Sequence, residues 1–434
     1  MATPYRIHIT PANTGLWNIE QSEEAAQTTT ETLQKDLEMP HHLLALYGTG
    51  ASVADIQKAY DLRHPLQRPV VSQHQDAAKD LITHWDHASK YLGKEEYYPD
   101  FLAYLQRAIE REGYESVVKS HLLKGDDSAN DLLLRLHAGV VHPLIQLMYG
   151  LEWKQPAIVA QALAQTCVHN VEGLDQLLLA SEQKANATPR STKMPSLLSM
   201  YEKVNADSHL AGSVRIEDKS KIEDGIIQRA KEPMLAILEQ VHVGPEELDE
   251  RTAEMFHAMI LVASSAAIHP PHHVKYDFFL MRPWLSIADK VRLLEWKIRL
   301  DLVQYVARGC PAVSLEGIES YVPKQPSEGS LYDFGDDGHA IKQARATAIC
   351  HELMEEYKDK SWAVLKDESI WKKIQHMVVD AVEGPGVLYV RSTGFDEAWK
   401  GVPGQYSPKR SPDLLRALQT GSGSSPEALK PYSQ

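Results

Sequence analysis

The stretch Leu136-His137-Ala138-Gly139-Val140-Val141-His142-Pro143-Leu144-Ile145-Gln146-Leu147 decides the fold class of this chain. Two histidines and one glutamine are the only polar side chains in it. A helix that is hydrophobic on nearly all sides lies inside a protein, where other elements must cover it. The stretch therefore predicts a buried helix at the centre of a layered body.

The rest of the chain follows the helical period. Apolar residues recur three to four positions apart, as in Leu81, Trp85, Ala88 and Leu92, and this spacing predicts one apolar face on each helix. Alternation with a period of two is confined to residues 387–390, which predict one short strand. The sequence therefore predicts an all-α protein. Further helical windows are residues 158–168, 234–241, 255–267, 293–306, 346–357 and 370–382.

Breaker-rich stretches interrupt the helices without dividing the chain. Residues 181–194, 205–221 and 322–338 are polar and rich in helix-breaking residues, which is typical of surface insertions. Neither a sharp change in composition nor a repeat of solenoid length is present. We expect one large, bundle-like multi-helix catalytic domain over residues 1–402. A Pro/Ser-rich extended tail should follow over residues 403–434.

Charge and composition exclude several classes of partner. Among the 434 residues, 45 basic and 59 acidic side chains give a formal net charge of −14. An acidic chain repels nucleic acid and anionic lipid surfaces. Neither a signal peptide nor an uncharged apolar window of membrane-spanning length is visible, so we expect a cytoplasmic protein. A small-molecule substrate is the expected partner, and the sequence leaves the oligomeric state open.

Known catalytic and cofactor motifs are largely absent. The three cysteines form no CxxC pair, which excludes a zinc ribbon and indicates a reducing compartment. No GxGxxG opens a helix and no P-loop occurs, so the chain has no flavin or nicotinamide fingerprint. His351 and Glu355 lie in HELME rather than HExxH, which excludes a zincin. No GxSxG elbow provides a serine nucleophile.

The 20 histidines are the unusual feature of the composition. His142 and Gln146 lie four residues apart on one face of the central apolar segment. A buried imidazole needs a hydrogen-bond partner, and for a single histidine a backbone carbonyl is the ordinary one. His257 is also buried by pattern, since it stands among Met255, Phe256 and Met259.

Two other segments could supply partners for His142. His41 and His42 open an apolar helix, and His339 and Lys342 share a face at the start of another. A buried lysine beside a histidine is costly unless it is paired or modified, for example as a carbamate. Imidazoles that converge from several helices can hold iron or zinc. The alternative for the His339/Lys342 turn is a solvated helix end.

Four strings of the sequence resemble one protein family. They are HHLLALY with GAS from His41, HPLI with YGLEW from His142, KYDFFLM from Lys275, and GHAIK with Arg345 from Gly338. In this order they resemble the questin oxidase-like family of fungal secondary-metabolite clusters. The resemblance implies an oxygenase-like enzyme that opens or rearranges aromatic polyketides such as anthraquinones. Some relatives look like non-haem iron enzymes, and others like Baeyer–Villiger oxidases.

The resemblance also assigns roles, with two departures. His42, His142 and His339 match family positions for metal ligands, with Lys342 as a carbamylated fourth ligand. Gln146 and Arg282 stand where the family pattern usually has histidine, and neither is a good iron ligand. The first hypothesis is therefore a non-haem Fe(II) oxygenase, with NADPH as a possible reductant. Its phenolic substrate would bind against the aromatic side chains Tyr149, Trp153 and Phe278.

The second hypothesis needs no metal. A relative that has lost ligands could bind a reactive polyketide intermediate and direct a cyclisation or an addition by positioning and hydrogen bonding. Gln146 and Arg282 would then donate to a developing oxyanion. His142 and His257 would act as acid–base groups near neutral pH.

Overall fold

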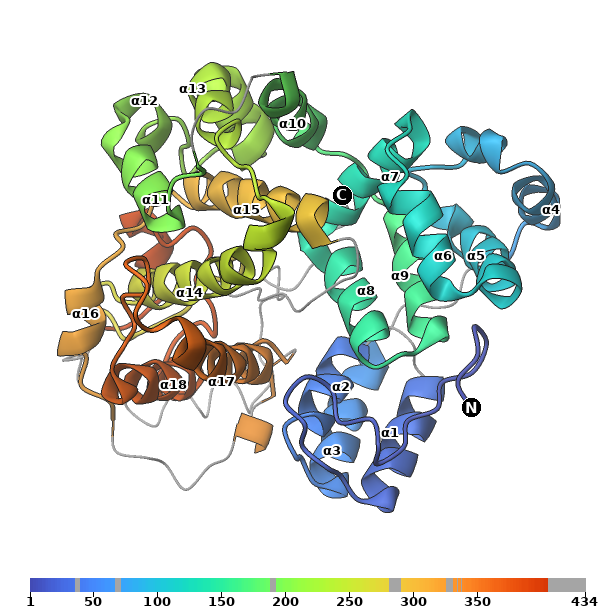
Figure 1. The fold of residues 1–434 in the computed structure, drawn as a ribbon. Coiled ribbons are helices and arrows are strands. Elements are labelled where there is room, and N and C mark those ends of the chain that lie inside the picture. The colour runs from blue at the N-terminus through green and yellow to red at the C-terminus, as the bar shows by residue number, and fades with distance from the viewer. Residues whose placement is uncertain are drawn as a thin grey trace, which may run out of the picture.

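The prediction of an all-α protein is confirmed. The computed structural model describes residues 1–35, 40–66, 72–187, 193–280, 290–324, 331–333, 335–336 and 338–404. Over these residues the chain forms helices and isolated β-bridges but no extended strand, and the helices pack into one body (Figure 1). The tail from residue 405 onward lies outside the described residues, so the proposed domain boundary stays a prediction.

Eighteen α-helices are assigned in the described residues. They are α1 (Glu23–Lys35), α2 (Pro40–Tyr47), α3 (Val53–Arg63), α4 (Gln75–Thr83), α5 (Tyr98–Glu112), α6 (Tyr114–Val118), α7 (Asp127–His137), α8 (His142–Glu152), α9 (Pro156–Val168), α10 (Leu178–Ala187), α11 (Leu197–Ala206), α12 (Ser208–Ala211), α13 (Gln228–Leu238), α14 (Leu248–Ala266), α15 (Lys290–Ala307), α16 (Leu315–Ser320), α17 (His339–Tyr357) and α18 (Glu368–Glu383).

Helix α2 joins the two halves of the molecule. In Figure 1, α4 to α9 lie on one side and α10 to α18 on the other, and α1 to α3 lie below α8 and α9, beside α17. α8 packs along α9, whereas α17 packs against α14 and α18. α2 contacts both α8 and α17, and all of its eight residues are buried. These three helices carry His41, His42, His142 and His339.

The sequence predicts one helix over the central apolar stretch, but the structure shows two. α7 ends at His137, a 3₁₀ turn follows over Gly139–Val141, and α8 begins at His142. Pro143 in the first turn of α8 explains the break, because its ring cannot follow a continuous helix. Val141 has a φ of 62°, a strained conformation for a β-branched residue. Strain therefore sits immediately before His142.

The predicted strand at residues 387–390 is not formed, and an isolated β-bridge stands in its place. Val390 forms an isolated parallel bridge with Asp277, and its carbonyl accepts a hydrogen bond from the Phe278 backbone N–H at 2.9 Å. The Asp277 carboxylate accepts the backbone N–H groups of Ser392 and Thr393 at 2.8 and 2.9 Å. These bonds replace a sheet and hold Phe278 beside Tyr389.

Lys275 fixes the same segment to the end of α18. Its ammonium is fully buried and donates to the backbone carbonyls of Ala381 and Gly384. Unpaired carbonyls at a helix C-terminus attract a cation, so this lysine caps α18. The first and third residues of the KYDFFLM string thus position Phe278 rather than take part in chemistry themselves.

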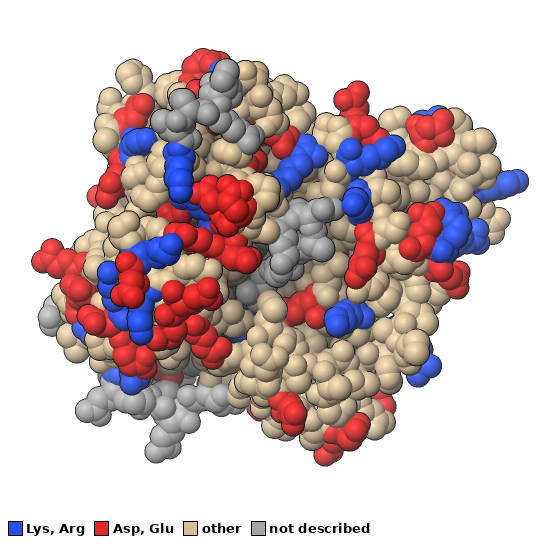
Figure 2. Space-filling view, viewed as in Figure 1, with Lys and Arg blue, Asp and Glu red and all other residues tan. Residues whose placement is uncertain are grey.

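Charged side chains cover the surface unevenly. On the face shown in Figure 2, basic residues stand among acidic ones, more densely over α17 and α18 than over α1 to α3. Within the described residues, no individual helix has both the length and the apolar character needed to cross a bilayer, although α7 and α8 meet the test together as a bent pair.

Candidate active site

Three side chains from three helices form a hydrogen-bonded row. His41 of α2 lies with its Nε2 atom 3.0 Å from Nε2 of His142, at the start of α8. On its other side, His41 Nδ1 lies 3.4 Å from Nζ of Lys342 in α17. The two imidazole rings meet edge to face, with their centroids 5.0 Å apart. His41 is therefore the central member of the row.

A charged Lys342 would set the tautomers along this row as follows. An ammonium group only donates hydrogen bonds, so Nδ1 of His41 must accept from Lys342. The proton of neutral His41 then lies on Nε2 and is donated to Nε2 of His142. His142 consequently carries its own proton on Nδ1.

The row is shielded from solvent. His41 and Lys342 are only 8% and 9% exposed. Burial lowers the pKa of His41 well below its usual range, and the charges of Lys342, His142, His339 and His42 lower it further. His41 is therefore neutral at physiological pH, which is the state that both accepts and donates a hydrogen bond.

His42 faces the start of α17. Gly338 precedes this helix with a φ of +82°, and a Cβ atom there would come within 2.4 Å of Cδ2 of His42. A glycine at this position therefore lets the N-terminus of α17 approach the imidazole closely. This contact brings His339 and Lys342 onto the same side of the helix as the histidines of α2.

His339 lies in an aromatic environment. Its ring centroid is 4.5 Å from that of Phe278 and 5.6 Å from that of Tyr389. The Tyr389 hydroxyl donates to the carboxylate of Asp336, which also accepts the backbone N–H of Ala340 at 2.9 Å. The acidic group thus anchors both Tyr389 and the first turn of α17. Phe278 thus lies beside His339, and its predicted contact with substrate stays a prediction.

A second polar group lies along the other side of the row. The Tyr149 ring is 6.4 Å from His41, and the guanidinium of Arg345 lies 6.0 Å from the same ring. Arg345 forms a buried ion pair with Glu152, including a hydrogen bond of 3.3 Å. Burial raises the pKa of Tyr149 to about 12, although the positive charge of Arg345 opposes this. Tyr149 is thus a neutral phenol that can donate a hydrogen bond.

Gln146 and Trp153 have contacts away from the row. The amide of Gln146 is fully buried and donates to Oε1 of Gln161 at 3.1 Å. Trp153 packs edge to face on Tyr47 at 5.5 Å between centroids. A Cβ atom at Gly48 would come within 2.8 Å of the Trp153 ring, so a glycine makes room for the indole. Trp153 therefore fills the core beneath the site, and its proposed contact with substrate stays a prediction.

His257 lies at the opposite end of α17 from His339. Its ring contacts Trp362 at 5.7 Å, and Trp362 in turn contacts Tyr357, the last residue of α17, at 6.0 Å. A helix of this length extends about 27 Å. Nε2 of His257 accepts the backbone N–H groups of Val364 and Leu365, both at 3.0 Å. The structure does not bring this predicted catalytic residue to the row.

Arg282 and His41 differ from what the sequence predicts in separate ways. Arg282 lies outside the described residues, so its predicted role as an oxyanion donor stays a prediction. The predicted site residue is His42, whereas the structure places its neighbour His41, in the same HH pair, in the row. Adjacent residues in a helix point about 100° apart, so either could have faced His142.

The predicted metal ligands do not assemble into a metal site in the described part of the chain. No group of three or more His, Cys, Asp or Glu side chains is arranged there to hold an ion. Nζ of Lys342 lies 3.4 Å from Nδ1 of His41, and the predicted carbamylation of this lysine stays a prediction. The iron site at His42, His142, His339 and Lys342 stays a prediction, as does the use of NADPH.

In the described residues, the fold and the site define an all-helical protein with a buried row of two imidazoles and a lysine beside aromatic side chains. The family model described as questin oxidase-like matches residues 38–347, and the chain belongs to this family. The match spans α2, α8 and the first half of α17, which are the helices that carry the row.

Individual relatives agree with this family. Oxidoreductase AflY of Aspergillus parasiticus is 32% identical over 79% of this chain and 73% of its own length. Questin oxidase of Aspergillus fumigatus is 31% identical over 84% of this chain and 87% of its own. Baeyer–Villiger monooxygenase dmxR6 of Cryptosporiopsis is 30% identical over 83% and 86%. The protein is thus an oxidoreductase.

Proposed function

We propose that this protein oxidises an aromatic polyketide of the anthraquinone type with molecular oxygen, at the row formed by Lys342, His41 and His142. The observation that supports the proposal best is the continuous hydrogen-bonded row itself. It lies beside Phe278 and Tyr149, whose rings suit a flat phenolic substrate. The substrate class is that of the relatives named questin oxidase.

In the proposed reaction, His142 removes the proton of a substrate phenol. Nε2 of His142 is the acceptor for this proton. It becomes available when the His41 ring rotates and its Nε2–H no longer donates to His142. The resulting phenolate is rich in electrons and reacts with O2, the named oxidant. If both oxygen atoms enter the product, the electrons balance without another reductant. Insertion of a single oxygen atom with release of water would require two electrons from a donor such as NADPH.

The remaining groups hold the charge that develops. Lys342 stabilises an anion near the row, and Tyr149 can donate a hydrogen bond to a phenolate or carbonyl oxygen. The buried Glu152 carboxylate keeps Arg345 against Tyr149. These groups lie on α8 and α17, so the rigid helices position the donors before the substrate arrives.

The test is turnover of questin under labelled oxygen. We expect the purified protein to convert questin to a product that gains one or two ¹⁸O atoms from ¹⁸O₂, as measured by mass spectrometry. Parallel reactions with Fe(II), with a chelator and with NADPH, together with elemental analysis, examine the iron and reductant predictions. The absence of labelled product under all of these conditions would contradict the proposal.

A second candidate function is a cyclisation or an addition that consumes no oxygen. The hydrogen-bonded row supports this function as well as it supports the oxidation. A cyclisation or an addition needs acid–base groups, and proton transfer through Lys342, His41 and His142 involves no change in oxidation state. In that case, turnover would continue under strict anaerobiosis and give a product of unchanged mass. The same experiment therefore separates the two candidates.

A further inference from the structure

A pocket lies on the outer side of α17 that the proposed reaction does not use. The pocket is partly open and has a volume of about 400 Å³, and it lies between α17, α18, the turn after α2 and the N-terminal loop. Pockets of this size hold small ligands. Its lining includes the rings of Trp17 and Tyr332, which we call its walls. We call the lining residues of α17 its floor, and Gln375 and His376 of α18 its rim.

The aromatic walls are held in place by their polar ends. Trp17 donates its indole N–H to the carboxylate of Glu352 at 2.8 Å. The Tyr332 hydroxyl donates to the backbone carbonyl of Thr49 at 2.6 Å. Both rings are therefore fixed before any ligand arrives, which lowers the entropy cost of binding against them.

The floor of the pocket suits a flat ligand. Ala344 and Ala348 lie four residues apart on α17, so they stand one above the other on a single face. Two methyl groups in this arrangement leave a shallow, even surface along the helix. Ile341 and Val379 extend this apolar surface on either side. An apolar surface of this kind suits a planar ring system.

The rim supplies hydrogen-bonding groups. Gln375 and His376 are adjacent, half-buried residues of α18, and both line the pocket. Throughout the described ranges, neither side chain takes part in an assigned hydrogen bond or ion pair. A carboxamide and an imidazole offer both donors and acceptors. They match hydroxyl and carbonyl oxygens at the edge of a ring.

The pocket is separate from the catalytic row. At 100° per residue, Ala344 and Ala348 lie about 120° to 180° around α17 from His339 and Lys342. The two sites therefore occupy different faces of one helix. Arg345 lies between them, because it lines the pocket and also contacts Tyr149 beside His41.

We propose that this outer pocket is a second binding site for a planar, oxygen-substituted aromatic molecule, distinct from the catalytic row. Aromatic walls, an even apolar floor and a polar rim together define this class of ligand. The assignment depends on the lining of the pocket alone, so it goes beyond the proposed oxidation and does not require it.

Calorimetric binding of 1,8-dihydroxyanthraquinone tests the second site. Ala344→Phe places a ring in the pocket, and we expect it to lower the number of bound ligands by one per chain. Trp17→Ala, which removes one wall, should weaken the same binding step by about tenfold. Ala236→Phe, at an exposed position of α13, is the matched control and should bind like the wild type. Thermal melting of each variant shows that the fold is retained.

Three results would overturn the proposal. One is an unchanged number of bound ligands in both Ala344→Phe and Trp17→Ala. Another is binding of palmitate to this pocket as tightly as the anthraquinone, because the site would then accept any apolar molecule. The third is loss of questin turnover in Ala344→Phe, which would make the pocket part of the catalytic site. If the protein does not oxidise questin at all, the ligand count still decides the question.

Discussion

The two ends of α17 each hold a buried histidine from a neighbouring helix, and the two histidines differ in their partners. At the N-terminal end, His41 bonds to His142 and Lys342, which are side chains that can change their protonation. At the C-terminal end, His257 accepts hydrogen bonds from two backbone N–H groups, which cannot change their protonation. Burial is similar in both places. The partners, rather than the burial, distinguish the two imidazoles.

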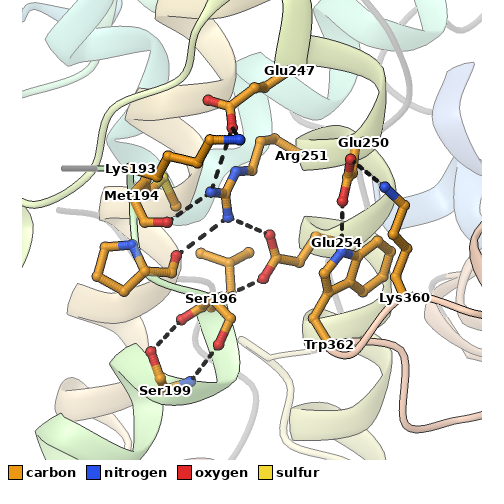
Figure 3. A network of polar contacts seen from close by, with 12 residues as sticks. Lys193, Met194, Ser196, Ser199, Glu247, Glu250, Arg251, Glu254, Lys360 and Trp362 are labelled. Carbon is orange, nitrogen blue, oxygen red and sulfur yellow. Dashed lines mark hydrogen bonds and ion pairs between the residues drawn. The ribbon is translucent and has the colours of Figure 1, made fainter.

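The surroundings of His257 support this contrast. Its neighbour Trp362 donates to Glu250 at 3.1 Å, and Glu250 also pairs with Lys360 at 2.8 Å (Figure 3). Alongside, Arg251 bonds to Glu254, whose carboxylate accepts the Leu197 backbone N–H at 2.8 Å. Each charge in this network has a partner, which is typical of a structural network.

The largest effect should come from His142. In His142→Ala we expect turnover of the proposed substrate to fall about 10²- to 10⁴-fold, the usual contribution of an acid–base group. Helix content, measured by far-UV circular dichroism, should stay unchanged. His257→Gln is the control and should keep turnover close to that of the wild type. Equal losses in the two variants would remove the distinction between the two ends of α17.

The next effect concerns stability at the His257 end. His257→Leu leaves two buried backbone N–H groups without an acceptor, at about 1–3 kcal/mol each. We expect the free energy of unfolding to fall by about 2–4 kcal/mol in urea titrations. His257→Gln can still accept with its carbonyl oxygen and should lose less than half of that. A stable leucine variant would mean that the two hydrogen bonds contribute little.

The same residue should make the protein sensitive to acid. Burial lowers the pKa of His257 from 6.5 to about 4 in the folded protein. Between these values the unfolded chain binds the extra proton and the folded chain does not, so stability falls as the pH falls through this window. From pH 7 to pH 5 the loss from this residue should be about 2 kcal/mol. Urea titrations of His257→Gln should show a correspondingly flatter pH dependence.

The smallest effect should come from the charge of Lys342. Lys342→Met removes the donor to His41, so the His41 tautomer is no longer fixed and kcat should fall about tenfold. Lys342→Arg keeps a donor and a charge and should recover part of this loss. Steady-state kinetics of both variants measure the difference. A methionine variant with wild-type kcat would show that the row ends at His41.

Periodicity was enough to predict the helical class, because burial of one face leaves a pattern that needs no long-range information. It also indicated that His142 is buried, whereas the position of His339 and Lys342 was left open between a buried site and a solvated helix end. It did not predict the break between α7 and α8. The apolar pattern continues across that break, and Pro143 stands in the first turn of the new helix.

The partners of each side chain were decided only by the tertiary structure. His41 and His42 are identical in type and adjacent in sequence, and only the packing of α2 between α8 and α17 selects His41 for the row. His257 had the same apolar surroundings in sequence as His142, yet the backbone of residues 364–365 satisfies it. A sequence fixes which residues are buried through local periodicity. Which buried groups meet depends on contacts between segments more than 100 residues apart, and no local pattern contains that information.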